Sequence, residues 1–255
     1  METLNMGTPA SSLLQGTGFR PANQIKSRQR MILNVQGKED TGKTHFLLTC
    51  PEPIALFDLD HNSESVVNKS DFLNKEIMIS EYFFERPSKG SNEAKLIKEA
   101  DLLWNRFMAE YKQALKEVKT VAIDTVGLLW ELLRMARFGK LTQVMPHHYG
   151  PLNAEMAQII DMAKQSDCNL ILSSTLAPQY INDQATGFWV RQGWSQLDYK
   201  VQYSIELSRA KTGPNKGSFQ SKILKFKPDP KMIDQVLINP RFKDISERAF
   251  PKGIN

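Results

Sequence analysis

The sequence predicts an α/β fold with a mainly parallel sheet, helices on both faces, and an antiparallel hairpin toward the C-terminus. Short apolar runs typical of buried strands alternate along the chain with segments whose apolar residues recur every three or four positions, as in amphipathic helices. The last two runs, 199–209 and 221–227, are close enough to pair with each other. A chain of 255 residues is long enough for one large domain of this class or two small ones.

The individual elements follow from these patterns in chain order. Residues 1–30 are polar and rich in Ser, Thr, Gly and Pro, so we expect a flexible extension, a candidate oligomerisation arm, before a domain spanning 31–255. The predicted strands are 31–37, 53–60, 119–126, 169–175, 199–209 and 221–227, and the predicted helices are 43–50, 93–118, 128–138 and 150–167. The clearest helix is 93–118, whose apolar residues at helical spacing are Leu96, Ala100, Leu103, Phe107, Tyr111, Ala114 and Val118.

The overall composition, with 41% hydrophobic and 24% charged residues, is that of a water-soluble globular protein. Cys50 and Cys168 lie far apart in apolar surroundings, which favours two buried thiols and a cytoplasmic location. No apolar stretch reaches 18 residues, so no membrane span is expected. Residues 176–255 hold 13 Lys and Arg against 7 Asp and Glu. This excess permits a polyanionic partner, and a solvated basic surface is the alternative.

Residues 37–44 read GKEDTGKT and match the phosphate-loop pattern G-x-x-x-x-G-K-[ST]. In this pattern the glycines let the backbone curl so that N–H groups point at phosphate oxygens, the lysine reaches the β- and γ-phosphates, and the final hydroxyl ligates Mg²⁺. A predicted strand precedes the motif and a predicted helix follows it, as the motif requires. The expected nucleotide contacts are Gly37, Lys38, Glu39, Asp40, Thr41, Gly42, Lys43, Thr44 and His45.

Acidic and hydroxyl side chains end three other predicted strands, and functional groups collect at the carboxyl ends of strands in a parallel sheet. Asp124 can hold Mg²⁺ together with the loop hydroxyl, or it can simply cap the next helix. Asp60 is the candidate that orients or deprotonates an attacking water, and Asp58, on the same face of the strand, is its rival. Ser174 and Thr175 are candidate hydrogen-bond donors to the γ-phosphate or the water.

Two patterns typical of GTPases occur in the wrong order. NKSD at 68–71 matches the guanine-reading N-K-x-D element and DTVG at 124–127 matches D-x-x-G, but guanine recognition should follow the D-x-x-G strand. Guanine specificity is therefore not expected. A small-molecule kinase would need an arginine-rich lid, and residues 139–150 carry His147 and His148 but no arginine. This histidine pair lacks further ligands at metal spacing, which favours a loop surface over a zinc site.

The segment IALFDLDHN at 54–62 resembles the second core strand of RecA-type recombinases, which runs into D-x-E-H. In that family the glutamate is the catalytic base, so the resemblance implies this role for Asp60, which is one methylene shorter. CNLILSST at 168–175 is similar to the family's fourth core strand, which ends in a glutamine that senses the γ-phosphate. Thr175 or Ser174 stands nearest to that position here.

The order of elements more closely resembles that of small phage-encoded RecA-like ATPases associated with single-strand annealing and recombination. A shared detail is the pair Tyr149-Gly150 before a predicted helix. The resemblance covers residues 18–230 and implies a RecA-like P-loop NTPase core.

The same resemblance implies a mobile DNA-binding loop after the fourth strand, over residues 176–200. Aromatic faces stack on bases, and arginine adds phosphate contacts and cation–π attraction. A hairpin whose aromatic rings pack on the core is the alternative. The candidate DNA-binding residues are Tyr180, Phe188, Trp189, Arg191 and Trp194.

Two further segments imply contacts between subunits. GFRPA at 18–22 resembles the F-x-x-A element that joins recombinase subunits, so Phe19 and Ala22 would fill pockets on a neighbour. Arg209 and Lys211 match in position the lysines that reach a neighbour's γ-phosphate in RecA-type filaments, and a solvated hairpin loop is the alternative. The implied assembly is a homo-oligomer, a ring or a filament, with ATP between subunits.

These features together predict a DNA-stimulated ATPase that uses ATP and Mg²⁺ and binds single-stranded DNA. The resemblance places it in phage-type recombination, annealing or replication, in the host cytoplasm if a phage encodes it, with a single-strand-binding protein as a further candidate partner. The alternative is a nucleotide-switched DNA-binding module with negligible turnover. Asp60 in place of a glutamate and the missing glutamine favour that alternative.

Overall fold

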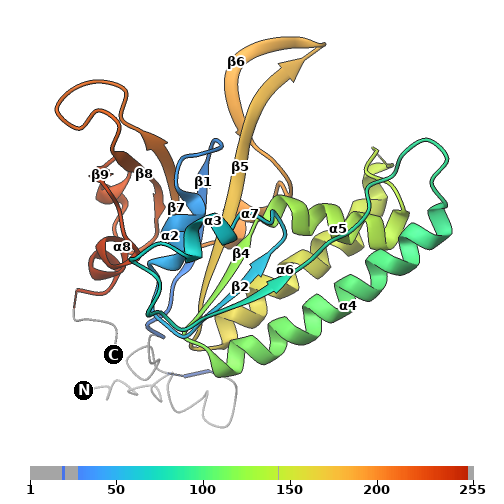
Figure 1. Ribbon diagram of the computed structural model, residues 1–255, viewed down its shortest axis with the longest axis horizontal. Helices are drawn as coiled ribbons and strands as arrows, with labels where there is room; N and C mark the ends of the chain where they lie inside the picture. The colour runs from blue at the N-terminus through green and yellow to red at the C-terminus, as the bar shows by residue number, and fades with distance from the viewer. Residues whose placement is uncertain (1–18, 21–27, 143, 252–255) are drawn as a thin grey trace, which may run out of the picture.

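The computed structural model describes residues 19–20, 28–142 and 144–251, and Figure 1 shows a central sheet with helices on both faces and one projecting hairpin. In chain order the elements are β1 (Ile32–Gly37), α2 (Lys43–Leu48), β2 (Ile54–Asp58), α3 (Glu64–Val67), β3 (Ile77–Glu81), α4 (Glu93–Glu117), β4 (Thr120–Asp124), α5 (Val126–Phe138), η2 (Pro146–His148), α6 (Tyr149–Gln165), β5 (Asn169–Ile181), β6 (Gln184–Arg191), α7 (Leu197–Lys200), β7 (Tyr203–Arg209), β8 (Phe219–Phe226), η3 (Pro230–Met232), β9 (Val236–Ile238) and α8 (Phe242–Ala249).

The sheet has the strand order β3-β2-β4-β5-β1-β7-β8-β9, and β6 pairs with β5 outside this row. Neighbouring strands from β3 to β7 in this row are parallel, whereas β8 and β9 are antiparallel to their neighbours. The predicted α/β fold with a mainly parallel sheet and an antiparallel C-terminal hairpin is confirmed. The register sets Gly37 beside Thr175 and Asp58 beside Asp124. The carboxyl ends of β1, β2 and β4 therefore lie at one edge of the sheet, beside Thr175 in the middle of β5.

Each face of the sheet has its own apolar core, because successive strand residues point to opposite faces. Ile32 packs in the core beneath α4, α5 and α6, whereas Leu33 packs in the core beneath α2 and α8. The predicted helix at 93–118 forms as α4. Its N-cap is Asn92, whose side chain accepts a hydrogen bond from Lys95 N at 3.1 Å. α5 ends at Gly139, whose φ of 64° is the left-handed conformation that favours glycine.

Several elements depart from the predictions. The strands β3 and β9 and the helix α8 were not predicted, and the strand expected at 169–175 continues to Ile181. This longer β5 pairs with β6, so most of the expected loop at 176–200 is a β-hairpin that projects from the body (Figure 1). The strand expected at 199–209 begins only at Tyr203, because the preceding residues form the short helix α7.

Both cysteines are buried free thiols, as predicted, and burial raises the pKa of Cys168 to about 12. Within the described ranges, no helix combines the length and apolarity needed to cross a membrane.

Candidate nucleotide-binding site

The phosphate loop, residues 37–44, connects β1 to α2, and its two glycines lie where a side chain would collide with neighbouring atoms. A Cβ on Gly37 would lie 2.4 Å from Thr41 Oγ1 and 2.7 Å from the Leu207 carbonyl oxygen. Gly42 has a φ of 86°, and a Cβ there would lie 2.9 Å from the ring of Phe219. The loop is therefore curled so tightly that only glycine fits at both positions, which is the shape a backbone cradle for phosphate needs.

Lys43 supplies the positive charge of the loop. Its Nζ donates a hydrogen bond to the carbonyl oxygen of Lys38 at 2.7 Å. Burial lowers the pKa of Lys43, while the carboxylates of Asp124 and Asp60 and two acids of the loop act in the opposite direction. The ammonium thus lies in a partly dehydrated position among carboxylates, where a phosphate would be a strong partner.

Asp124, only 2% exposed, accepts hydrogen bonds from Thr44 Oγ1 at 2.7 Å and from the hydroxyl of Ser173. Burial raises the pKa of Asp124, and the two hydroxyl donors oppose that shift. The cap of α5 is Thr125, whose hydroxyl accepts from Leu128 N at 3.4 Å, so capping is not the role of Asp124. A hydroxyl and a carboxylate side by side form the hard-oxygen donor set that suits Mg²⁺.

Asp58 and Asp60, the rival acids after β2, have different environments. The carboxylate of Asp58 is buried and accepts hydrogen bonds from the backbone N–H groups of Asp60 at 3.2 Å, His61 at 2.8 Å and Ser63 at 3.2 Å. Asp60 is exposed, lines the cavity in front of the phosphate loop, and accepts from Asn62 Nδ2 at 2.8 Å. Asp58 therefore holds the turn, and Asp60 is the acid that faces the cavity.

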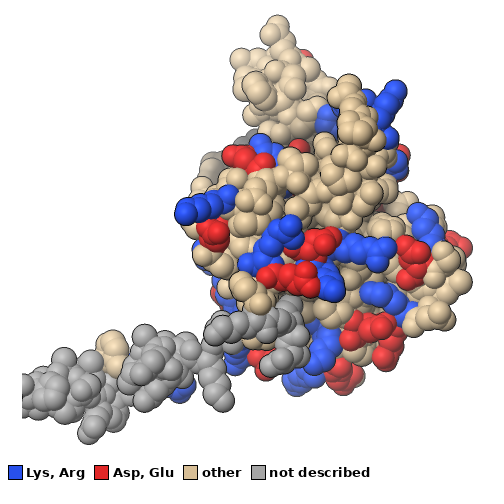
Figure 2. Space-filling view, turned by 90° about the vertical axis from the view of Figure 1, so that its left-hand side faces the viewer, with Lys and Arg blue, Asp and Glu red and all other residues tan. Residues whose placement is uncertain are grey.

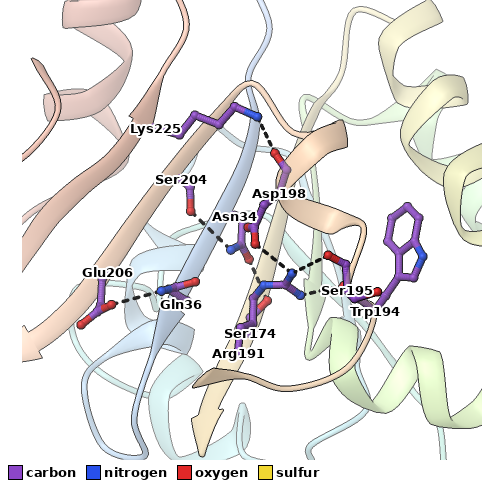
Figure 3. Close-up of polar contacts among 10 residues, drawn as sticks. All are labelled: Asn34, Gln36, Ser174, Arg191, Trp194, Ser195, Asp198, Ser204, Glu206 and Lys225. Carbon is purple, nitrogen blue, oxygen red and sulfur yellow. Dashed lines mark hydrogen bonds and ion pairs between the residues drawn. The ribbon is translucent and has the colours of Figure 1, made fainter. Parts of the chain in front are cut away.

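The polar residues in the middle of β5 differ in part from the prediction. Ser174 is buried on the opposite face, where its hydroxyl donates to Asn34 Oδ1 at 2.7 Å, and Asn34 Nδ2 in turn donates to Ser204 Oγ at 3.4 Å (Figure 3). The expectation that Ser174 contacts phosphate is corrected. Thr175 lines the cavity, as expected. Ser173, on the same face of β5 as Thr175, was missed, although the two-residue period of a strand could have indicated it.

A cavity of about 1000 Å³ lies in front of the loop, large enough for a nucleotide. The predicted residues that line it are Glu39, Asp40, Thr41, Gly42, Lys43, Thr44, His45, Asp60, Asp124, Thr175 and Arg209. Gly37 and Lys38 are not in its walls. The lining residues that sequence reasoning missed include Arg86, Trp130, Arg134, Gln192 and Phe219, which come from four segments far apart in the sequence.

The predicted subunit contacts are only partly described. Arg209 Nε donates to the Asp40 carbonyl oxygen at 3.0 Å, and its guanidinium lies 4.4 Å from the ring centroid of Phe219. Arg209 therefore contacts the phosphate loop of its own chain, and its contact with a neighbour stays a prediction. Lys211 is exposed on the loop after β7. Phe19 is 72% exposed, and Ala22 lies outside the described residues.

The β5–β6 hairpin, residues 176–191, carries three of the predicted DNA-binding rings on its surface. Tyr180 is 63% exposed, Phe188 71% and Trp189 44%. The Nζ of Lys38 lies 3.4 Å from the centroid of the Trp189 ring. Asp183 is the only charged residue between 176 and 190, and Figure 2 shows the projecting top of the molecule almost without charged side chains.

The other two candidate DNA-binding residues anchor the base of the hairpin. Trp194 is 1% exposed, and its Nε1 donates to Asn153 Oδ1 at 2.9 Å. The guanidinium of Arg191 donates to the Trp194 carbonyl oxygen at 2.8 Å and pairs with Asp198 at 3.0 Å (Figure 3). The expectation that Trp194 and Arg191 face DNA is therefore corrected, and for Trp194 the core-packing alternative holds.

Comparison with known proteins adds to this geometry. A family model described as an AAA domain (AAA_24) matches residues 29–210. No curated protein matches significantly. The crystal structure of the RadB recombinase is similar, with a TM-score of 0.48, 14% sequence identity, and coverage of 92% of this chain and 94% of that chain. Because the family model spans well over half of the chain, the protein belongs to this AAA domain family.

Proposed function

We propose that this protein binds and hydrolyses ATP with Mg²⁺ and that it binds single-stranded DNA, in phage-type recombination, annealing or replication. One observation carries the ATPase part: Lys43, Thr44, Asp60 and Asp124 lie around a single cavity at the edge where the strands end. These are the residue types that phosphoryl transfer needs, namely a phosphate-binding cation, ligands for Mg²⁺ and a group that orients water.

Each residue has a distinct task in this mechanism. The backbone of the phosphate loop and the Lys43 ammonium hold the β- and γ-phosphates. Thr44 and Asp124 would hold Mg²⁺, which neutralises negative charge on the phosphates when it is bound. Ser173 keeps the Asp124 carboxylate oriented through its hydrogen bond. Asp60 accepts a hydrogen bond from the attacking water and takes its proton.

The exposed rings of the β5–β6 hairpin support the DNA part of the proposal. Tyr180, Phe188 and Trp189 offer faces on which unpaired bases can stack. Because the hairpin itself has almost no cations, phosphate contacts would come from the body below it, for example from Lys211 and other lysines of the β7–β8 region. Arg209, Lys211, Phe19 and Ala22 remain candidates for contacts in a homo-oligomer.

Steady-state ATP hydrolysis with and without single-stranded DNA tests this proposal. Lys43→Ala should lower turnover by about 10²–10³-fold, as expected for loss of one preorganised charge partner of the phosphates. Lys98→Ala, which removes an exposed lysine on the outer face of α4, is the matched control and should leave turnover unchanged. Equal turnover in wild type and Lys43→Ala would overturn the assignment.

Binding of a labelled single strand tests the DNA part separately. Tyr180→Ala and Phe188→Ala should each weaken binding by about 5- to 150-fold, the cost of one lost base–ring stack. Unchanged binding in both variants would remove the hairpin from the proposal.

A second candidate, a nucleotide-switched DNA-binding module with negligible turnover, is favoured by one contact. The carboxylate of Asp60 already accepts a hydrogen bond from Asn62 at 2.8 Å, which competes with a water molecule for the same oxygen. Tight nucleotide binding without turnover, by calorimetry and product release on one sample, would select this candidate.

A further inference from the structure

A cation–π contact joins the phosphate loop to the β5–β6 hairpin. The Lys38 ammonium lies over the face of the Trp189 ring at 3.4 Å from its centroid. Lys38 is the first variable residue of the loop, and Trp189 is on β6, which belongs to the projecting part of the molecule. Within the described residues, no carboxylate forms an ion pair with Lys38, so its ammonium contacts the aromatic face instead.

Lys38 is also tied to the cation that holds phosphate. Its carbonyl oxygen accepts hydrogen bonds from Lys43 Nζ at 2.7 Å and from Thr41 Oγ1 at 2.8 Å. When Lys43 moves to a β- or γ-phosphate, the peptide of Lys38 loses one of these two donors. The backbone and the side chain of Lys38 thus connect the phosphate-binding group to the hairpin.

We propose that Lys38 couples nucleotide binding to the hairpin by exchanging the face of Trp189 for a phosphate oxygen. This inference rests on the proposed function, because it needs a bound polyphosphate. A charge-assisted hydrogen bond to phosphate is stronger than a cation–π contact at a solvent-exposed ring. The Lys38 side chain, which lies outside the cavity walls here, would therefore turn from the Trp189 ring toward a bound phosphate. The Trp189 face is then available to a stacking ligand such as an unpaired base.

The coupling is reciprocal. If nucleotide frees the Trp189 ring for a ligand, a ligand on that ring frees Lys38 for the nucleotide, and each raises the affinity of the other by the same factor. A single-stranded oligonucleotide should therefore tighten nucleotide binding in the wild type but not in Lys38→Met.

Acrylamide quenching of Trp189 fluorescence tests the exchange. The Trp189 signal is the difference between wild type and Trp189→Phe, which removes the contribution of Trp104, Trp130 and Trp194. A non-hydrolysable Mg·ATP analogue should raise the quenching of Trp189 by about twofold in the wild type, because the ammonium leaves the ring. Lys38→Met should show the higher quenching throughout, with no further change on nucleotide addition.

A neighbouring variant and a direct binding measurement complete the experiment. Val190→Ala alters the adjacent side chain, which points to the other face of β6, and should keep the nucleotide response of Trp189. Calorimetric titration with the same analogue shows whether nucleotide binds. Binding without a Trp189 response, or a Lys38→Met response equal to that of the wild type, overturns this inference alone. Absence of binding overturns the proposed function as well.

Discussion

The two halves of β5 have opposite surroundings. Its first six residues, from Asn169 to Ser174, are all buried, whereas Pro178, Tyr180 and Ile181 in the second half are exposed. In the buried half, polar side chains have specified partners, as Ser173 does with Asp124 and Ser174 does with Asn34. In the exposed half, the side chains of Tyr180 and Ile181 are 63% and 57% exposed. One strand thus contributes buried, hydrogen-bonded side chains to the candidate nucleotide site and exposed side chains to the projecting hairpin.

The largest expected effect is a loss of ATP turnover, and it should distinguish the exposed Asp60 from the buried Asp58. Asp60→Asn should lower ATP turnover by about 10²–10⁴-fold, because it removes the general base that we propose, while the free energy of unfolding changes by less than about 0.5 kcal/mol. Asp58→Asn should destabilise the fold by about 1.5–3 kcal/mol, because the carboxylate accepts hydrogen bonds from three backbone N–H groups. Turnover assays and urea unfolding measure both, and full turnover in Asp60→Asn would refute its role.

Two tryptophans of the hairpin segment give the next contrast. Trp194→Ala should lower the free energy of unfolding by about 3–5 kcal/mol, because it leaves a buried cavity and removes the hydrogen bond to the Asn153 side chain. Trp189→Ala should cost less than about 0.5 kcal/mol, since its ring is largely on the surface. Chemical denaturation measures both costs. Similar values would mean that the hairpin packs on the body more firmly than its exposure indicates.

Two buried serines, Ser173 and Ser221, test whether the hydrogen bond to Asp124 stabilises the fold. Ser173→Ala should destabilise the protein by about 1–3 kcal/mol, because it removes a donor from the buried Asp124 carboxylate. Ser221→Ala is the matched control, since its buried hydroxyl has no hydrogen-bond partner among the described residues, and it should be neutral within about 0.5 kcal/mol. Thermal or urea unfolding decides between them, and equal costs would contradict the special role of Ser173.

The smallest effect concerns thiol chemistry. With a pKa of about 12, Cys168 is almost entirely protonated at neutral pH, and raising the pH to about 9 still leaves little thiolate. Native Cys168 should therefore be inert to a thiol reagent, whereas Phe188→Cys on the exposed hairpin should react within minutes and faster at higher pH. Mass spectrometry after labelling distinguishes the two sites. Rapid labelling of native Cys168 would show that the sheet opens locally.

Much of the fold could be predicted because its signals are local. The phosphate loop is a motif of eight consecutive residues that can be identified from their spacing. In α4, apolar residues recur at helical spacing along 25 residues. β3 could not be predicted in the same way. It is a five-residue edge strand with three exposed and two partly buried side chains, and its apolar run, Ile77–Ile79, is shorter than that of a central strand.

By itself the sequence determined the parallel α/β class, the phosphate loop, and the position of Asp124 at a strand end. Only the tertiary structure decided between Asp58 and Asp60, turned Ser174 away and Ser173 toward the site, and separated the buried Trp194 from the exposed Trp189. The physical reason is the same in each case. Residue type and spacing fix which groups a segment can offer, but burial and partners depend on elements that are distant in the chain and meet only at the sheet edge.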